Sequence, residues 1–230
     1  DFEEGKEGKK YLHIRSEDNA GNKSTWNTVE FDVDFSAPEV KVSENFKGNE
    51  KAIFTISGTA NDTKGMASAN SVVITQRNSA GKALTVTSTA TGNSWESQTL
   101  PVMDNGKSVE VGKEADYNGT YTYTVTATDW CGKTSSITRT INFDTEAPVI
   151  EVQNLENGTT LSANAVSVKG SVEDESKIKG TYYSTAETAP AVPADGLNGS
   201  WTNWKTVNWP LSLTSLKDGI HNLHLVAVDE

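Results

Sequence analysis

Residues 119–148 read GTYTYTVTATDWCGKTSSITRTINFDTEAP, and this stretch decides the fold of the chain. Between residues 120 and 128, apolar side chains alternate strictly with five threonines. A period of two is typical of a strand with one buried and one exposed face. Turn residues follow at Asp129–Gly132, and Ile137, Ile141 and Phe143 mark a second strand. The stretch therefore predicts an antiparallel hairpin, with a new unit beginning at Pro148.

The same pattern occurs at two other places. A glycine stands ten residues before an aspartate three times, at Gly8 and Asp18, Gly119 and Asp129, and Gly219 and Asp229. The residues two, four and six positions before each aspartate are predicted to face inward; in the first copy they are Ser16, Ile14 and Leu12. So many matched offsets indicate a repeat array.

Two longer segments align without gaps. TVEFDVDFSAPEVKV (28–42) matches TRTINFDTEAPVIEV (138–152), which places Asp34 and Asp144 in the same register before an Ala-Pro pair. ISGTAND (56–62) matches VKGSVED (168–174). The junctions between repeats therefore share one design.

The repeats predict an all-β fold of tandem immunoglobulin-like antiparallel β-sandwiches arranged end to end. We interpret residues 1–36 as the C-terminal hairpin of a truncated repeat, 37–146 as a complete sandwich, and 147–230 as a sandwich lacking its last strand. Strands are expected near residues 10–18, 23–35, 39–44, 51–59, 71–77, 82–88, 94–102, 119–128, 133–143, 149–152, 165–173, 178–184, 202–207 and 220–229.

Composition narrows the classes of function. The net charge of −11 argues against nucleic acid, which needs a basic surface, and is compatible with cation binding or simple solubility. No apolar run approaches the roughly 18 residues that a membrane span needs, so no membrane insertion is expected within this segment. The single cysteine, Cys131, cannot form an internal disulfide, and we expect it to fill the position of Ala20 in the first repeat.

The elements SEDNAGN, ATDWCGK, FDTEAPVIEV and DGIHNLHLVAVDE resemble the immunoglobulin-like tandem repeats of large bacterial secreted proteins, surface proteins and adhesins. In that family an Asp-x-Ala-Gly-Asn turn closes the last hairpin, and a final strand leads into an Asp-Thr-x-Ala-Pro junction. This chain departs from the pattern at Trp130-Cys131 and at Phe35-Ser36. The resemblance implies a fold and a secreted or cell-surface location, but no ligand.

Carboxylates at the junctions are the sharpest candidates for a site. An immunoglobulin-like sandwich brings the entering linker, the turn between its second and third strands and its last hairpin turn to one end. We therefore expect Asp34, Asp62 and Asp129 to gather at the first junction, and Asp144, Glu146, Asp174 and Asp229 at the second. Such oxygen ligands from several loops suit Ca²⁺. The competing interpretation is that each aspartate only caps its own turn.

Aromatic residues in the third unit are a second candidate site. Tyr182, Tyr183, Trp201, Trp204 and Trp209 could stack against sugar rings, or they could pack within a small sandwich and its loop. Asn93-Ser-Trp95 resembles Gly199-Ser-Trp201, which suggests that Trp201 takes the structural position of Trp95.

No catalytic residues are expected. The histidines, His13, His221 and His224, have no plausible nucleophile beside them, and no catalytic sequence motif occurs. The sequence favours a non-catalytic stalk that spaces or displays a binding element toward an extracellular ligand, a host surface or a polysaccharide. The alternative is a carbohydrate-binding accessory module of an extracellular enzyme.

Overall fold

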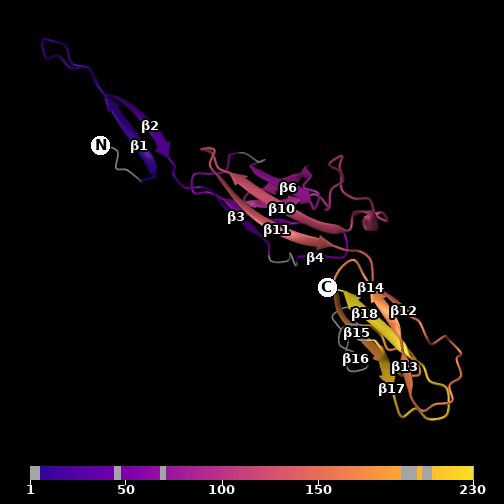
Figure 1. Ribbon diagram of the computed structural model, residues 1–230. Helices are drawn as coiled ribbons and strands as arrows, with labels where there is room; N and C mark the ends of the chain where they lie inside the picture. Colours follow the sequence, from indigo (N-terminus) through magenta and orange to yellow (C-terminus); the bar gives the residue numbers. More distant parts are fainter. Residues whose placement is uncertain (1–5, 44–47, 68–70, 193–200, 204–208, 230) are drawn as a thin grey trace. The chain divides into compact units, whose positions relative to one another are not determined.

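The computed structural model describes residues 6–43, 48–67, 71–192, 201–203 and 209–229. In this part of the chain the regular secondary structure is nearly all strand, and the one helical segment is the 3₁₀ helix η1 (Glu114–Tyr117). The chain divides into two compact units, Asp1–Phe143 and Asp144–Glu230. Figure 1 shows the order of the strands within them.

An isolated hairpin opens the first unit. Strands β1 (Gly8–Ile14) and β2 (Asn27–Val33) pair antiparallel from Gly8 opposite Val33 to Ile14 opposite Asn27. Leu12 and Ile14, expected to face inward, are 42% and 51% exposed. The predicted hairpin therefore forms, with both strands shorter beside the turn than predicted, and its apolar face is exposed in the described part of the chain.

A β-sandwich forms the rest of the first unit. Its five-stranded sheet has the order β4-β11-β10-β6-β7, with β4 parallel to β11, and its four-stranded sheet has the order β3-β5-β9-β8. The strands are β3 (Glu39–Val42), β4 (Asn49–Glu50), β5 (Ser57–Asn61), β6 (Val72–Asn78), β7 (Ala83–Val86), β8 (Ser88–Thr91), β9 (Ser94–Ser97), β10 (Gly119–Thr128) and β11 (Thr134–Phe143). This confirms the immunoglobulin-like fold class.

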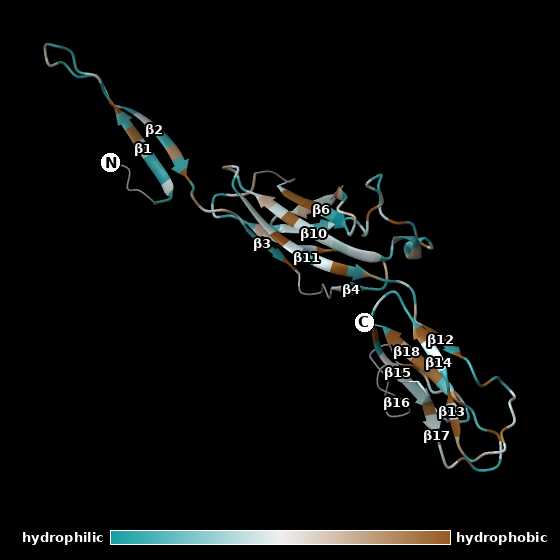
Figure 2. Ribbon diagram, viewed as in Figure 1, coloured by the Kyte–Doolittle hydropathy of each residue, from teal (hydrophilic) through white to brown (hydrophobic). Residues whose placement is uncertain are grey.

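The alternation between residues 120 and 128 builds the core of this sandwich. Alternate residues of β10 are buried, and Tyr123 and Ala127 are fully inaccessible. Figure 2 shows brown apolar bands recurring along β11 as well. The phenol of Tyr121 donates to the carbonyl of Tyr117 at 2.6 Å, the bond that immunoglobulin-like domains use to fix the start of this strand.

The second unit has three small sheets among its described residues. These are β12 (Val149–Val152) with β14 (Gly170–Glu173), β13 (Val166–Val168) with β17 (Leu211–Leu213), and β15 (Ile178–Ser184) between β16 (Thr202–Asn203) and β18 (His224–Asp229). The sequence did not predict strand β17. The buried apolar residues of the second unit are Val168, Trp201 and Leu211.

A glycine under a tryptophan occurs in both units. A Cβ on Gly58 would lie 1.9 Å from the carbonyl oxygen of Lys41 and 2.6 Å from the Trp95 ring. At the aligned Gly170, a Cβ would lie 2.0 Å from the Glu151 carbonyl and 2.6 Å from the Trp209 ring. Trp209, and not Trp201 as the sequence predicts, is therefore the counterpart of Trp95.

A buried glutamine ties one loop to the core of the first sandwich. Gln76 exchanges two 2.8 Å hydrogen bonds with the backbone of Val102 and accepts a third, of 2.9 Å, from the Tyr123 hydroxyl. Gln76 is 2% exposed and Tyr123 is inaccessible. Burial raises the pKa of Tyr123 well above its ordinary value, so the hydroxyl remains a donor.

We predict that Gln76→Leu destabilises the fold much more than Tyr123→Phe. Leucine would leave the backbone N–H and carbonyl of Val102 and the Tyr123 hydroxyl buried without partners, at a cost of about 3–6 kcal/mol in the free energy of unfolding. Phenylalanine removes one donor while Gln76 keeps both bonds to Val102, at a cost of about 1 kcal/mol. Urea unfolding followed by tryptophan fluorescence measures both, and equal losses would contradict the proposed network.

Candidate metal centre

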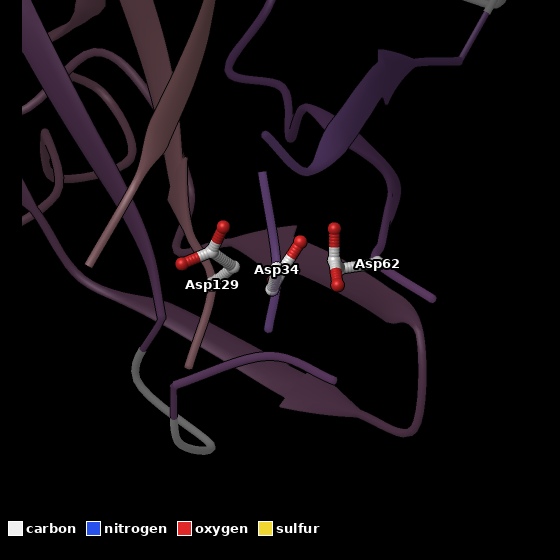
Figure 3. A group of neighbouring side chains, drawn as sticks. All are labelled: Asp34, Asp62 and Asp129. Carbon is white, nitrogen blue, oxygen red and sulfur yellow. The ribbon is translucent and has the colours of Figure 1, made fainter. Parts of the chain in front are cut away.

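Three carboxylates from separate elements meet in the first unit. Asp34 follows β2, Asp62 follows β5 and Asp129 follows β10. One oxygen from each lies within 4.8 Å of the others, and Figure 3 shows the three side chains side by side. The structure thus brings together all the residues that the sequence assigned to this junction.

Each carboxylate also caps its own turn, but with only one oxygen. Asp34 Oδ1 accepts the N–H of Ser36 at 3.1 Å, Asp62 Oδ1 that of Lys64 at 2.7 Å, and Asp129 Oδ1 that of Lys133 at 2.8 Å. Aspartate makes such turns readily. The capping interpretation therefore accounts for Oδ1 of each carboxylate, but it explains neither Oδ2 of Asp34 nor Oδ2 of Asp129.

The remaining oxygens are placed where an unpaired charge is costly. Asp34 is 8% exposed and Asp129 is inaccessible. Their Oδ2 atoms are buried and have no hydrogen-bond partner within the described residues. A buried charge needs a counter-charge or hydrogen bonds, and three gathered carboxylates repel one another. This arrangement is suited to a cation held by oxygen atoms.

Two lysines border the three carboxylates. The ammonium group of Lys133 donates to the backbone carbonyl of Asp34 and lies 4.0 Å from Asp34 Oδ1. It also lies 5.6 Å from the centre of the Phe35 ring. The Lys64 ammonium pairs with Asp32 at 2.9 Å. Neither lysine is among the residues that the sequence predicts at this junction.

The first hairpin turn shows what an aspartate does there without partners from elsewhere in the chain. The Asn22 amide donates to Asp18 Oδ2 at 2.9 Å, and the backbone N–H groups of Asn22 and Ala20 donate to Oδ1 at 2.9 Å. Both oxygens of Asp18 are therefore satisfied. Lys133 stands at the position of Asn22 in the repeat alignment. This replacement is the feature of the sequence that distinguishes the two turns.

A second group of three carboxylates lies in the second unit. Asp144, Asp174 and Asp229 offer oxygens within 4.8 Å of one another, and all three are half-buried. Asp144 Oδ1 accepts the N–H of Glu146 at 3.1 Å, and Asp174 Oδ1 accepts that of Ser176 at 2.7 Å. Glu146 is exposed and is not one of the three, so it contributes its backbone rather than the carboxylate that we expected.

The aromatic residues proposed as a second site differ in burial and in the residues that they contact. Trp201 is 7% exposed, and its indole N–H donates to the Ala191 carbonyl at 3.1 Å. Tyr182 is half-buried, with its ring over Gly180, and Tyr183 is also half-buried but at the next position of the strand. Trp209 is half-buried against Gly170. Trp204 lies outside the described residues.

Cys131 and the three histidines lie in separate local surroundings. Cys131 is exposed, and its pKa is raised, first by partial desolvation and then by the charges of Asp34 and Asp129. The rings of His13, His221 and His224 bond to Thr28 Oγ1 and to the carbonyls of Lys217 and Ala186. The described residues include no helix with the length and hydropathy to cross a bilayer.

Three solved structures match this chain at low sequence identity. A tetra-tandem repeat in the extending region of a large adhesion protein matches 97% of this chain with a TM-score of 0.36 and 17% identity. Domains FN1–FN3 of chicken CNTN1 match 94% (TM-score 0.30, 15% identity), as does a 1.5-MDa bacterial ice-binding adhesin (TM-score 0.29, 14% identity). The matches cover 56%, 70% and 71% of those chains, so this chain spans about half the length of the first. No protein-family model and no curated protein matches the sequence.

We predict that Asn22→Ala raises the pKa of Asp18. The pKa of Asp18 is lowered mainly by the Asn22 amide and next by the Asn22 backbone N–H. A carboxyl group with a lowered folded pKa stabilises the turn above its unfolded pKa, and this contribution disappears as the pH falls through the folded value. Carbon-detected NMR of the Asp18 carboxyl should show the titration moving toward the ordinary aspartate value in Asn22→Ala and staying in place in Asn19→Ala.

Proposed function

We propose that this chain is a non-catalytic spacer segment of an extracellular, adhesin-like repeat protein, and that its two groups of carboxylates bind Ca²⁺ to hold each linker against the sandwich that follows. The segment would place a binding element at a set distance from the surface that carries it. The binding element would contact an extracellular ligand, a host surface or a polysaccharide.

One repeated observation carries the proposal. In each unit the aspartate before the Ala-Pro pair lies within 4.8 Å of two turn aspartates of the sandwich that follows it, as Asp34 does with Asp62 and Asp129. The aspartates at the corresponding positions of the second repeat, Asp144, Asp174 and Asp229, form the second group. A cation shared by a linker residue and two turns would restrict the linker, which is what a stiff spacer requires.

The donor atoms favour calcium among the common metals. Both groups offer carboxylate oxygens and neither includes a histidine or cysteine, a set that suits hard cations and not zinc. Ca²⁺ accepts irregular shells of six to eight oxygens, so backbone carbonyls and water could complete the shell. Extracellular calcium modules typically bind with dissociation constants of about 10⁻⁴ to 10⁻³ M.

The sugar-binding alternative has less support. A hollow on the outer face of β3-β5-β9-β8 is lined by hydroxyl groups, with Lys41 and Glu96 beside them, but Trp95 in its wall is only 2% exposed. The aromatics of the second unit range from buried to half-buried where they are described. Among the residues that the structure describes, neither region presents an exposed aromatic face of the kind on which sugars stack.

We predict that calorimetric titration finds two Ca²⁺ per chain, that Asp34→Asn removes one, and that Asp144→Asn removes the other. Asparagine keeps the side-chain oxygen that accepts the N–H of Ser36 or Glu146 and removes the charge. Metal binding is thereby separated from turn capping. Millimolar calcium should also raise the melting temperature of the parent chain, by mass action on the folded state.

The control for these variants is Asp104→Asn. Asp104 is an exposed carboxylate paired with Lys82 at 2.6 Å and belongs to neither group. It should leave both the heat of binding and the stoichiometry unchanged. Absence of any calcium response in the parent chain would show that the aspartates serve only as turn caps.

We further predict that calcium narrows the distance distribution between spin labels at Asn19 and Ser79. Asn19 lies in the exposed β1–β2 turn and Ser79 in the exposed β6–β7 turn, on either side of the first carboxylate group. Both labels go into a Cys131→Ala background, which copies Ala20 of the first hairpin. The narrowing should be absent in Asp34→Asn; an equal width with and without calcium would contradict a stiffening role.

A further inference from the structure

One substitution within the repeat separates the Asp129 turn from the Asp18 turn. In the first hairpin, Asn22 bonds both oxygens of its aspartate, through its backbone and its amide. At the same position Lys133 keeps the backbone bond to Asp129 Oδ1, but its side chain reaches Asp34 instead. Asp129 Oδ2 is left buried and without a hydrogen-bond partner in the described structure.

The Lys133 side chain replaces that local bond with a long-range one. It connects the turn after β10 to a residue 99 positions earlier, on the linker that follows β2. Its side chain is one-third exposed, whereas the Asp34 side chain is 1% exposed. The ammonium group therefore reaches the buried linker from the solvent side. Lysine commonly packs its methylene chain in this way while its ammonium group stays hydrated.

We propose that Lys133 is a resident cation of the first carboxylate group: it holds the linker at Asp34 when no metal is bound, and it weakens calcium binding there. The second half of this inference rests on the proposed calcium function. The first half does not, because it concerns the metal-free protein.

Charge and geometry give the direction of both effects. The ammonium donates to the Asp34 backbone carbonyl and approaches Oδ1, so it leaves Oδ2 available to a metal. A divalent ion bound between Asp34 and Asp129 would nevertheless lie within several ångströms of this positive charge. Repulsion between two such cations is worth at least about 1 kcal/mol even in water and more in a partly buried site.

Lys64 strengthens the metal-free hold from a second turn. Its ammonium pairs with Asp32 at 2.9 Å while its backbone N–H caps Asp62. In the aligned second repeat, Asn142 stands at the position of Asp32 and Ser176 at that of Lys64. Both members of the ion pair are thus replaced together by neutral residues, which marks the pair as a feature particular to the first junction.

The test compares Lys133→Met and Lys133→Arg in an Asp144→Asn background, where only the first group would bind calcium. Methionine keeps an apolar stem of similar length and removes the charge, while arginine keeps the charge. Lys82→Met is the matched control, because Lys82 is an exposed lysine paired with Asp104 away from the group. Two readouts are used: hydrogen exchange at the amides of Phe35 and Ser36 in EDTA, and calcium titration by calorimetry.

In EDTA, Lys133→Met should exchange both amides faster than the parent, and Lys133→Arg should restore the slow rate. In calcium, Lys133→Met should bind about fivefold more tightly or better, which is the factor that corresponds to the removed repulsion. Lys82→Met should change neither readout. Unchanged exchange together with unchanged or weaker calcium affinity in Lys133→Met would overturn the inference.

Failure of the proposed calcium function would look different. If no variant binds calcium, the calorimetric half of the inference falls with that function. Faster exchange in Lys133→Met would then still establish the metal-free hold, because the exchange readout in EDTA contains no calcium. Slow exchange in every variant would remove that half as well.

Discussion

The buried second oxygens of Asp34 and Asp129 are the constraint on which this junction depends. Each carboxylate satisfies one oxygen within its own turn, and the other is buried with no hydrogen bond from the described protein. Such atoms are expensive to bury, so a fold that keeps them needs a cation or a compensating charge. Lys133 supplies part of that charge, and a divalent ion would supply the rest. In our proposal, either cation would hold the linker against the sandwich that follows it.

This arrangement follows from the ordinary properties of strands. Alternation along β10 buries one face and carries the chain to a turn at one end of the sandwich, where Asp129 begins the hairpin loop. The linker and the turn after β5 arrive at the same end, because antiparallel neighbours reverse direction. Repeating the sequence pattern repeats the geometry, and three carboxylates meet again at Asp144, Asp174 and Asp229. The two groups of carboxylates then differ through single neighbouring residues such as Lys133.

The sequence predicted several of the strands that stay in one sheet. Residues 119–128, 149–152 and 178–184 form strands with the predicted bounds. The predicted strands 51–59, 82–88 and 165–173 are each interrupted, because the chain changes sheet or partner inside them. Apolar and polar residues continue to alternate where a strand passes from one sheet or partner to another, so the period of two does not show where the change occurs. The carboxylate groups could be predicted from the repeat offsets, apart from Glu146. The contact between Lys133 and Asp34 could not be predicted, because a long side chain has several possible partners. The packing of Trp209, in place of Trp201, over Gly170 could not be predicted either, because it depends on three-dimensional contacts.

The most direct test of the account is a crystal structure of the chain grown with and without millimolar calcium. The account predicts density for one ion at the first group, with Asp34 Oδ2, Asp129 Oδ2 and an oxygen of Asp62 at about 2.3–2.6 Å, as in other calcium sites. The turn bonds to Oδ1 should be unchanged, and the ion should be absent from the calcium-free crystals. Carboxylates in the same positions with no ion between them at millimolar calcium would contradict the central claim.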